Sequence, residues 1–277
     1  MESIQNFLTL DIEEWYHANY EGLDPVTQPQ ETHLEALVER LIDLCAERGV
    51  RTTCFVLGSV AEAKPGIVKK LHRAGHEIAS HGYGHELVHP MGPARFADDL
   101  RVSCDILEAL TGEKVLGYRA PSFSVTREAL PWYYEALENA GLTYSSSVFP
   151  GRTFLYGIPD FPDRIHAPVI SGQRRNIVEF PVPVVRIAGK QMGLYIRLFP
   201  GWAIARRMAR DNRAGKPVVL YVHPREIDPH QPRLPLPFLQ SVIHYWGIQG
   251  CEAKLQFLLK HAQFGRMQDA VPAFGAA

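Results

Sequence analysis

Acidic and histidine side chains at separate points of the chain have the types and spacing of a metal-assisted hydrolytic site. Asp11 and Glu13 end an apolar run that begins at Leu8. If this run is a strand, alternation puts Asp11 and Glu13 on one face and Ile12 on the other. Strand interiors disfavour carboxylates, so acids at a strand end are typical of a cleft or a ligand site. A frayed end with solvated acids is the alternative for this segment alone.

Two histidines complete a candidate metal site. A carboxylate and two neutral imidazoles commonly bind a catalytic divalent metal ion and leave one position open for water. Glu13, His81 and His85 would supply these three ligands. Gly82 and Gly84 lie between the two histidines and allow the backbone to bend around an ion.

The histidine spacing alone does not select this pair, because the chain has three His-x-x-x-His pairs. His72 is predicted on a helix that precedes its strand, so His72 and His76 would lie at the wrong end of the sheet. His89 is interpreted as a surface histidine or as part of a groove. Only His81 and His85 follow directly from the end of a strand.

The elements that must position these residues alternate along the chain. β-Branched and apolar runs predict strands that begin at Leu8 and at 51–57, 75–80, 114–118, 142–147, 177–182 and 217–222. Helical patterns follow from a Thr32/Glu35 capping box to Gly49, and at 65–74, 92–111, 126–140, 202–214, 238–246 and 252–262. This order predicts an α/β fold of parallel strands with the active site at their C-terminal ends.

Composition narrows the possible partners and locations. The 277 residues are 46% hydrophobic and 21% charged, with a formal net charge of −1. This near-neutral charge argues against nucleic acid as a partner. We predict no transmembrane segment and no signal peptide, and hence a cytoplasmic protein that could work at the inner membrane face. The scattered cysteines predict buried free thiols: Cys45, Cys54, Cys104 and Cys251.

Five motifs in order carry a family resemblance. They are LDIEE at 10–14, SHGYGH at 80–85, YRAPSF at 118–123, TYSSSVFP at 143–150 and LYVHP at 220–224. The chain resembles polysaccharide deacetylases of the NodB-homology type (carbohydrate esterase family four), in the branch associated with exopolysaccharide loci. The resemblance covers nearly the whole chain, and the ordered set is far more specific than any single motif.

The resemblance implies a fold and a domain organisation. The expected fold is a distorted (β/α) barrel of the NodB-homology type with a C-terminal helical extension. Residues 1–277 would form a single catalytic domain, with a long surface insertion around 149–168 and a family-specific extension around 224–277. A divalent metal ion, usually Zn²⁺, would lie near the C-terminal ends of the strands.

The resemblance also implies a role for each matching residue. These are Asp11 as general base, His223 as general acid, Arg119 as the residue that orients the base, the backbone N–H of Ser122 as oxyanion donor, and Glu13, His81 and His85 as metal ligands. Amide hydrolysis needs an activated nucleophile, stabilisation of the developing oxyanion and a proton for the leaving amine. This set supplies all three.

Two departures from the family pattern leave alternatives open. The first motif contains Glu13 and Glu14 where most members have adjacent aspartates; strand parity favours Glu13 as the ligand, with Glu14 as the alternative. Related sequences often have an acid near position 145, where this chain has a serine. The acid that adjusts His223 is therefore undetermined between Glu226 and Asp228.

Three aromatic residues could form a sugar-stacking surface: Tyr83, Phe123 and Trp15. Plain packing is the more common role of aromatic residues beside a barrel mouth.

The predicted function is removal of N-acetyl groups from N-acetylhexosamine units of a glycan or a lipid-linked saccharide during exopolysaccharide synthesis. Zn²⁺ is the expected cofactor, with other divalent ions as alternatives, and a homo-oligomer is compatible with the sequence. Two other functions are weighed: hydrolysis of a small linear or cyclic amide, and glycan binding without catalysis. The sugar and the chain length are not encoded in the motifs.

Overall fold

A parallel sheet forms the centre of the molecule in the computed structural model, which describes residues 5–17, 19, 32–151, 157–187 and 190–275. Its main strands are β1 (Asn6–Ile12), β2 (Thr53–Val56), β3 (Glu77–Ser80), β4 (Gly117–Tyr118), β5 (Tyr144–Ser145), β8 (Val178–Glu179) and β11 (Val219–Val222). Their order in the sheet is β11-β1-β2-β3-β4-β5-β8, and a further strand, β12 (Phe264–Gly265), pairs with the start of β1. The sheet curves as an incomplete barrel.

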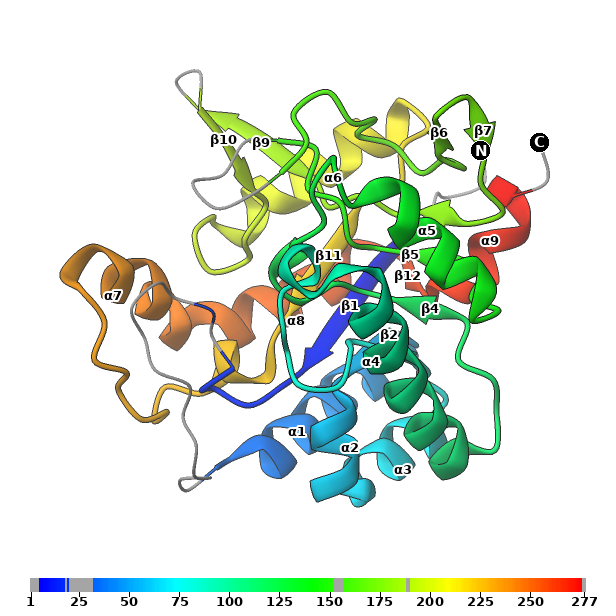
Figure 1. Cartoon of the computed structure of the whole chain (residues 1–277). Helices are drawn as coiled ribbons and strands as arrows, with labels where there is room; N and C mark the ends of the chain where they lie inside the picture. The colour runs from blue at the N-terminus through cyan, green and yellow to red at the C-terminus, as the bar shows by residue number, and fades with distance from the viewer. Residues whose placement is uncertain (1–4, 18, 20–31, 152–156, 188–189, 276–277) are drawn as a thin grey trace.

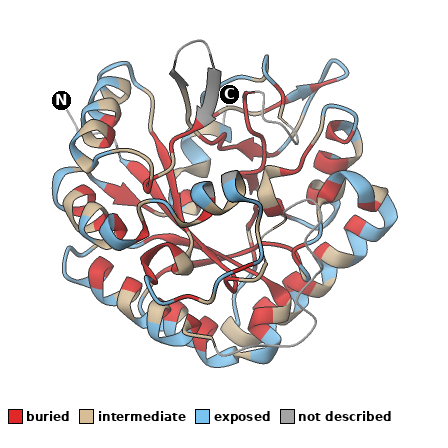
Figure 2. Cartoon of the chain, turned by 90° about the vertical axis from the view of Figure 1, so that its left-hand side faces the viewer, coloured by how far each residue is buried: buried red, intermediate tan, exposed pale blue. Residues whose placement is uncertain are grey.

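Helices surround this sheet (Figure 1). They are α1 (Leu34–Ala46), α2 (Gly58–Ala63), α3 (Pro65–Arg73), α4 (Val88–Thr111), α5 (Leu130–Asn139), α6 (Gly201–Arg213), α7 (Phe238–Tyr245), α8 (Cys251–His261) and α9 (Met267–Gly275). Figure 2 shows buried residues on the strands and on the inward sides of these helices. None of the described helices has both the length and the hydropathy of a membrane span.

The predicted alternation of strands and helices is confirmed, with shorter strands than the patterns suggested. Each motif residue directly follows a strand: Glu13 after β1, His81 after β3, Arg119 after β4 and His223 after β11. Because the strands are parallel, these residues meet at one edge of the sheet. The prediction that these polar residues lie together at the C-terminal edge of the sheet is therefore confirmed.

Some local predictions were wrong or incomplete. The Thr32/Glu35 capping box is not formed: His33 is the N-cap residue of α1 and makes no capping hydrogen bond. The Thr32 hydroxyl instead accepts a hydrogen bond from the Lys64 ammonium group. Helix α2 was not predicted, because its six residues are too few to show a helical period. The four cysteines are buried free thiols, as predicted.

The segment around 149–168 is partly anchored to the core. Phe149 and Ile158 are buried, and the Ile158 N–H donates to the Phe149 carbonyl at 2.9 Å. This part of the predicted insertion therefore does not lie wholly on the surface, and residues 152–156 are outside the described residues. Two hairpins follow it that the sequence patterns did not predict: β6 (Val169–Ile170) with β7 (Gln173–Arg174), and β9 (Val184–Ile187) with β10 (Lys190–Gly193).

The C-terminal extension contains a strand as well as helices. Beside β12, the start of α9 is fixed to the N-terminal ends of the strands: the Met267 N–H donates to Thr53 Oγ1 at 2.8 Å, and the Gln268 N–H donates to Glu77 at 3.2 Å. Glu77 is buried and also accepts hydrogen bonds from the hydroxyls of Thr53 and Tyr144, both at 2.6 Å. Its burial raises the pKa of the Glu77 carboxyl group. The extension is therefore part of the barrel floor.

Gly117 in β4 has no space for a side chain, and this generates a stability prediction. A Cβ atom at Gly117 would lie 1.9 Å from Cζ of Tyr144, whose hydroxyl is held by Glu77. Gly117→Ala should therefore lower the free energy of unfolding by about 2 kcal/mol or more. Chemical denaturation would measure this change.

Gly66 in α3 provides the matched control. Its added Cβ would meet no atom within 4 Å. Gly66→Ala should leave stability unchanged or raise it by up to about 1 kcal/mol, because alanine favours the helix. Equal effects of the two substitutions would contradict the packing of Tyr144 against Gly117.

Candidate active site

Glu13, His81 and His85 form a compact, buried group at the C-terminal edge of the sheet. Their ligand atoms all lie within 4.8 Å of one another, and they are the one such group of three or more among the described residues. Glu13 Oε2 lies 2.7 Å from His85 Nε2 and 3.7 Å from His81 Nε2. Neither contact has hydrogen-bond geometry, so this buried oxygen has no hydrogen-bond partner among the described residues. Such an arrangement fits a shared cation.

The backbone fixes the tautomer of His81. His81 Nδ1 lies 2.8 Å from the carbonyl oxygen of Arg119. A carbonyl only accepts hydrogen bonds, so Nδ1 carries a proton, and in the neutral ring the lone pair of Nε2 is directed toward Glu13. Histidine ligands of metals are commonly oriented in this way.

The electrostatics of the group favour an ionised Glu13. Burial alone would raise the pKa of this carboxyl group, but the nearby His85 and His223 outweigh it and hold the pKa well below its usual range. The His17 ring stacks on His85 with centroids 5.8 Å apart, and burial lowers the pKa of His17 to about 4. His17 is therefore neutral near pH 7 and adds no competing charge.

Glu14 points away from the histidines. Its buried carboxylate lies 3.0 Å from the ammonium group of Lys64, which is partly exposed. The adjacent acids thus have separate partners, and Glu13 is the one beside His81 and His85. The sequence left this choice open because Lys64, the partner of Glu14, lies far from Glu14 along the chain.

Arg119 holds Asp11 in place. Its guanidinium is fully buried, and Nη1 donates to Asp11 Oδ1 at 2.6 Å and to Thr9 Oγ1 at 2.7 Å. The other edge of the guanidinium donates to the carbonyl and hydroxyl oxygens of Ser146, at 3.2 and 2.9 Å. These bonds leave Asp11 Oδ2 free of Arg119, 3.7 Å from His223 Nε2. Thr9 and Ser146 were not predicted as site residues, although Ser146 lies in the fourth motif.

Glu226 is the acid that faces His223. Glu226 Oε2 accepts a hydrogen bond from the backbone N–H of His223 at 3.3 Å, and it lies 3.8 Å from Nδ1 of the His223 ring. Asp228 instead pairs with His33 at 2.9 Å. Burial would lower the pKa of His223, but Glu13 and Glu226 outweigh it and raise the pKa above its ordinary value.

A buried arginine holds Glu226. Arg197 Nε donates to Glu226 Oε1 at 2.7 Å, and its Nη1 donates to the carbonyls of His244 and Trp246 at 3.0 and 3.2 Å. Burial raises the pKa of Glu226, but Arg197 and His223 outweigh this effect and lower the pKa far below its usual range. No sequence motif marked Arg197, because its partners lie far along the chain.

Strained backbone lies at the site. His85, Ser122 and Phe123 have positive φ angles of 60°, 54° and 54°, in the left-handed region that non-glycine residues rarely adopt. The Asn19 amide links two of them, because it donates to Ser122 Oγ at 3.3 Å and to the His85 carbonyl at 3.4 Å. The Asn19 side chain thus connects Ser122 to His85.

The three predicted aromatic residues have different surroundings. Phe123 packs edge-to-face on Tyr221 and lies 5.5 Å from the Arg119 guanidinium carbon. Trp15 is buried. The Tyr83 hydroxyl donates to Glu62 on α2 at 2.8 Å, so its side chain is directed at that helix. Their contact with a sugar stays a prediction.

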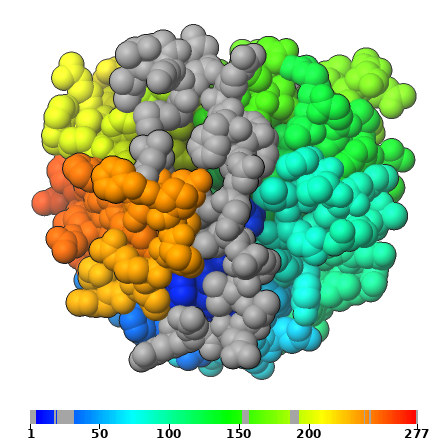
Figure 3. Space-filling model, turned by 60° about the vertical axis from the view of Figure 1, so that its left-hand side comes forward, coloured from blue at the N-terminus to red at the C-terminus, as the bar shows by residue number. Residues whose placement is uncertain are grey.

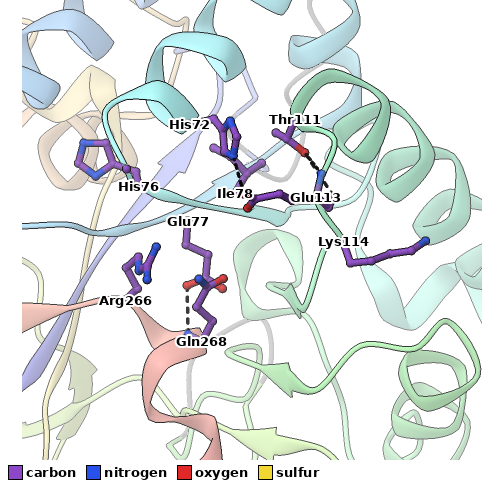
Figure 4. A pocket seen from close by; sticks show the side chains of 10 residues that line it. His72, His76, Glu77, Ile78, Thr111, Glu113, Lys114, Arg266 and Gln268 are labelled. Carbon is purple, nitrogen blue, oxygen red and sulfur yellow. Dashed lines mark hydrogen bonds and ion pairs between the residues drawn. The ribbon is translucent and has the colours of Figure 1, made fainter.

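A polar hollow of about 120 Å³ lies at the N-terminal end of β3, opposite to the end that carries His81 (Figure 4). His72 lies on its wall, 3.3 Å from Glu113, and His76 Nδ1 accepts a hydrogen bond from the Thr52 N–H. Both histidines have partners within the protein and lie at the N-terminal ends of the strands. This confirms that His72 and His76 belong to the wrong end of the sheet for the candidate site.

Two family models match the chain in succession. Residues 27–145 match a model described as polysaccharide deacetylase, and residues 146–272 match a model described as a domain of unknown function, DUF3473. The first model includes His81, His85 and Arg119. Asp11 and Glu13 precede it, and His223 lies in the second.

Curated relatives match part of the chain. This chain is 31% identical over 121 residues to a peptidoglycan deacetylase-like protein of Gibberella zeae. The aligned region covers 43% of this chain and 35% of the relative. The chain is 28% identical over 96 residues to a peptidoglycan-N-acetylglucosamine deacetylase of Bacillus cereus, which covers 35% of each. The chain therefore spans about a third of the length of these relatives.

Solved structures share the fold. A Mycobacterium smegmatis structure described as a polysaccharide deacetylase aligns with a TM-score of 0.59 at 21% identity, over 87% of this chain and 77% of that one. The allantoinase PuuE aligns with a TM-score of 0.59 at 17% identity, over 98% and 90%. At these identities the likeness concerns the fold alone, and it confirms the predicted NodB-type (β/α) barrel.

The separate partners of Glu13 and Glu14 predict different effects on metal binding. Glu13→Gln should weaken Zn²⁺ binding by more than about a hundredfold, because it removes the only carboxylate beside His81 and His85 among the described residues. Glu14→Gln should retain the metal. Elemental analysis after dialysis would measure Zn²⁺ per chain, and metal loss in Glu14→Gln alone would reverse the assignment.

Proposed function

We propose that the protein is a metal-dependent amide hydrolase acting on N-acetylhexosamine units, because residues 27–145 match a family model described as polysaccharide deacetylase. Its substrate would be a glycan or a lipid-linked glycan precursor in exopolysaccharide biosynthesis, met in the cytoplasm or at the inner membrane face. The observation that carries the proposal is the buried Glu13, His81 and His85 group beside Asp11 and His223.

The donor set fits a zinc ion. One carboxylate and two imidazoles converge, Glu13 Oε2 is buried without a hydrogen bond among the described residues, and the His81 tautomer leaves Nε2 available. Bound there, Zn²⁺ would polarise the amide carbonyl and lower the pKa of water. Manganese or another divalent ion is compatible with the same ligands.

The protein residues would divide the proton transfers between them. Asp11 would take a proton from the attacking water through Oδ2, since Arg119 engages only Oδ1. His223 would donate a proton to the leaving amine, and its raised pKa favours the protonated form that this step requires. The Ser122 N–H would donate to the developing oxyanion.

We also propose that residues 1–277 act as one catalytic domain. The proposal is supported by the pairing of β1, which precedes the first family match, with β2 and with β11 from the second. Asp11, Arg119 and His223 come from these different parts of the chain, so each part would be needed for turnover.

Acetate release tests the chemistry directly. The chain would be incubated with a panel of N-acetylated oligosaccharides after chelation, with and without added Zn²⁺. Zinc-dependent release from at least one member is expected. Silence across the panel would instead favour a small-amide substrate or a non-catalytic glycan-binding protein, and a small cyclic amide in the same panel separates these two.

Substitutions of the proposed base and acid should separate catalysis from metal binding. Asp11→Asn and His223→Ala should each lower kcat by about a hundredfold or more while Zn²⁺ content stays near that of the wild type. Steady-state acetate release and elemental analysis would be measured on the same preparations. Near-normal turnover in either variant would remove the role proposed for that residue.

Glu226 predicts a pH effect. It raises the pKa of His223, and a general acid loses activity as the pH rises through its pKa. Glu226→Gln should therefore move the alkaline limb of the kcat/KM profile to lower pH. Asp228→Asn is the matched control, because Asp228 pairs with His33 instead. An unchanged alkaline limb in Glu226→Gln would contradict the proposed pairing.

A further inference from the structure

Helix α7 carries an exposed apolar face. Phe238, Val242 and Trp246, the last just beyond the helix, are 85%, 38% and 62% exposed. Their spacing of four residues places them along one side of the helix. They are three of the five large hydrophobic residues that are exposed in the described part of the chain. We call these three residues the α7 face.

The opposite side of α7 is fixed to the protein through polar groups. His244 is fully buried, and its ring nitrogen Nε2 lies 3.5 Å from Arg225 Nη1. The carbonyls of His244 and Trp246 accept hydrogen bonds from the buried Arg197. The helix is thus held with a histidine inward and aromatic residues outward, the reverse of the usual arrangement.

Cationic side chains border the α7 face. The Arg233 guanidinium lies 4.3 Å from the centre of the Tyr245 ring, and with Trp246 it lines a hollow of about 300 Å³. Asp228, the acid in this hollow, is paired with His33. The stretch 229–251 contains no aspartate or glutamate.

Helix α6 extends this surface. Arg197, four residues before α6, binds the end of α7, and Trp202 near the start of α6 is 64% exposed. Arg206 and Arg210 follow on the exposed side of α6, and Arg210 pairs with Asp211 at 3.4 Å. The stretch 180–210 also lacks acidic residues. In Figure 3 the yellow surface of the α6 region lies beside the orange surface of the α7 region.

We propose that the α7 face and the adjoining start of α6 dock onto an anionic lipid bilayer. Tryptophan and phenylalanine suit the boundary between headgroups and acyl chains, and flanking arginines suit anionic headgroups. Two acid-free stretches give this side a positive charge although the whole chain has a net charge of −1. A protein partner is less well matched, because these arginines would need a complementary acidic surface.

The docking surface adjoins the candidate site. Arg197 connects the carbonyls at the end of α7 to Glu226, which faces His223. Figure 1 shows α7 at the left-hand edge of the molecule. A saccharide attached to a lipid in the same bilayer would therefore be presented near the site, a consequence that rests on the proposed function.

Vesicle co-sedimentation of the full chain tests the docking. Wild-type protein should sediment with vesicles of phosphatidylglycerol and phosphatidylcholine at low salt, and much less with pure phosphatidylcholine or at high salt. The double variant Phe238→Ser with Trp246→Ser should bind these anionic vesicles at least roughly tenfold more weakly than the wild type. The double variant Arg206→Gln with Arg233→Gln should lose most of the salt dependence.

Val169→Ser is the matched control, because Val169 is 64% exposed on the separate β6 hairpin. It should bind vesicles like the wild type. The proposal would be overturned if the wild-type protein did not sediment with the anionic vesicles, or if the Phe238/Trp246 variant bound them fully. A dimer that dissociates in this variant, without vesicle binding by the wild type, would instead identify the face as a contact between two copies.

Asp11→Asn separates this proposal from the proposed chemistry. It should bind vesicles like the wild type and lower kcat for acetate release by about a hundredfold or more. Vesicle binding without turnover on any substrate would therefore overturn the chemistry alone, and turnover of soluble oligosaccharides without vesicle binding would overturn the docking alone.

Discussion

The buried charge of Arg119 is the constraint on which the site depends. A fully buried guanidinium must be paired and hydrogen-bonded, and Arg119 satisfies this requirement with Asp11, Thr9 and Ser146. The guanidinium carbon also lies 4.2 Å from the centre of the Phe55 ring, which belongs to β2. The same residue orients a proposed ligand through its backbone, because its carbonyl fixes the His81 tautomer. Arg119 therefore positions both the Asp11 carboxylate and the His81 ring.

The two ends of the barrel use polar groups differently. At the floor, Glu77 is satisfied by Thr53, Tyr144 and the start of α9, which closes that end. At the mouth, Glu13 Oε2 lacks a hydrogen bond within the described residues, and His85 has a strained backbone. Unsatisfied and strained groups cost stability, so their presence beside Asp11 and His223 supports the site proposed at this end of the barrel.

Much of the fold and site could be predicted from the sequence because the information is local. Apolar runs marked the strands, and the polar residues directly after them marked the C-terminal edge of the sheet. The choices that failed or stayed open depend on distant partners. Lys64 separates Glu14 from Glu13, and Arg197 fixes Glu226 beside His223. Such pairs have no periodic signal, and β12 and α2 are too short to give one.

The pairing of β1 with β11 has a consequence for the order in which the protein is assembled during translation. Asp11 and Arg119 can meet once the first half of the chain has left the ribosome, since β1 to β4 are neighbours in the sheet. His223 follows β11, which pairs with β1 from residue 219 onward. Such distant pairing forms late. A nascent or truncated chain could thus hold the proposed base and metal ligands while lacking His223, the proposed general acid. Such a chain would have no turnover by the proposed mechanism until synthesis had passed β11.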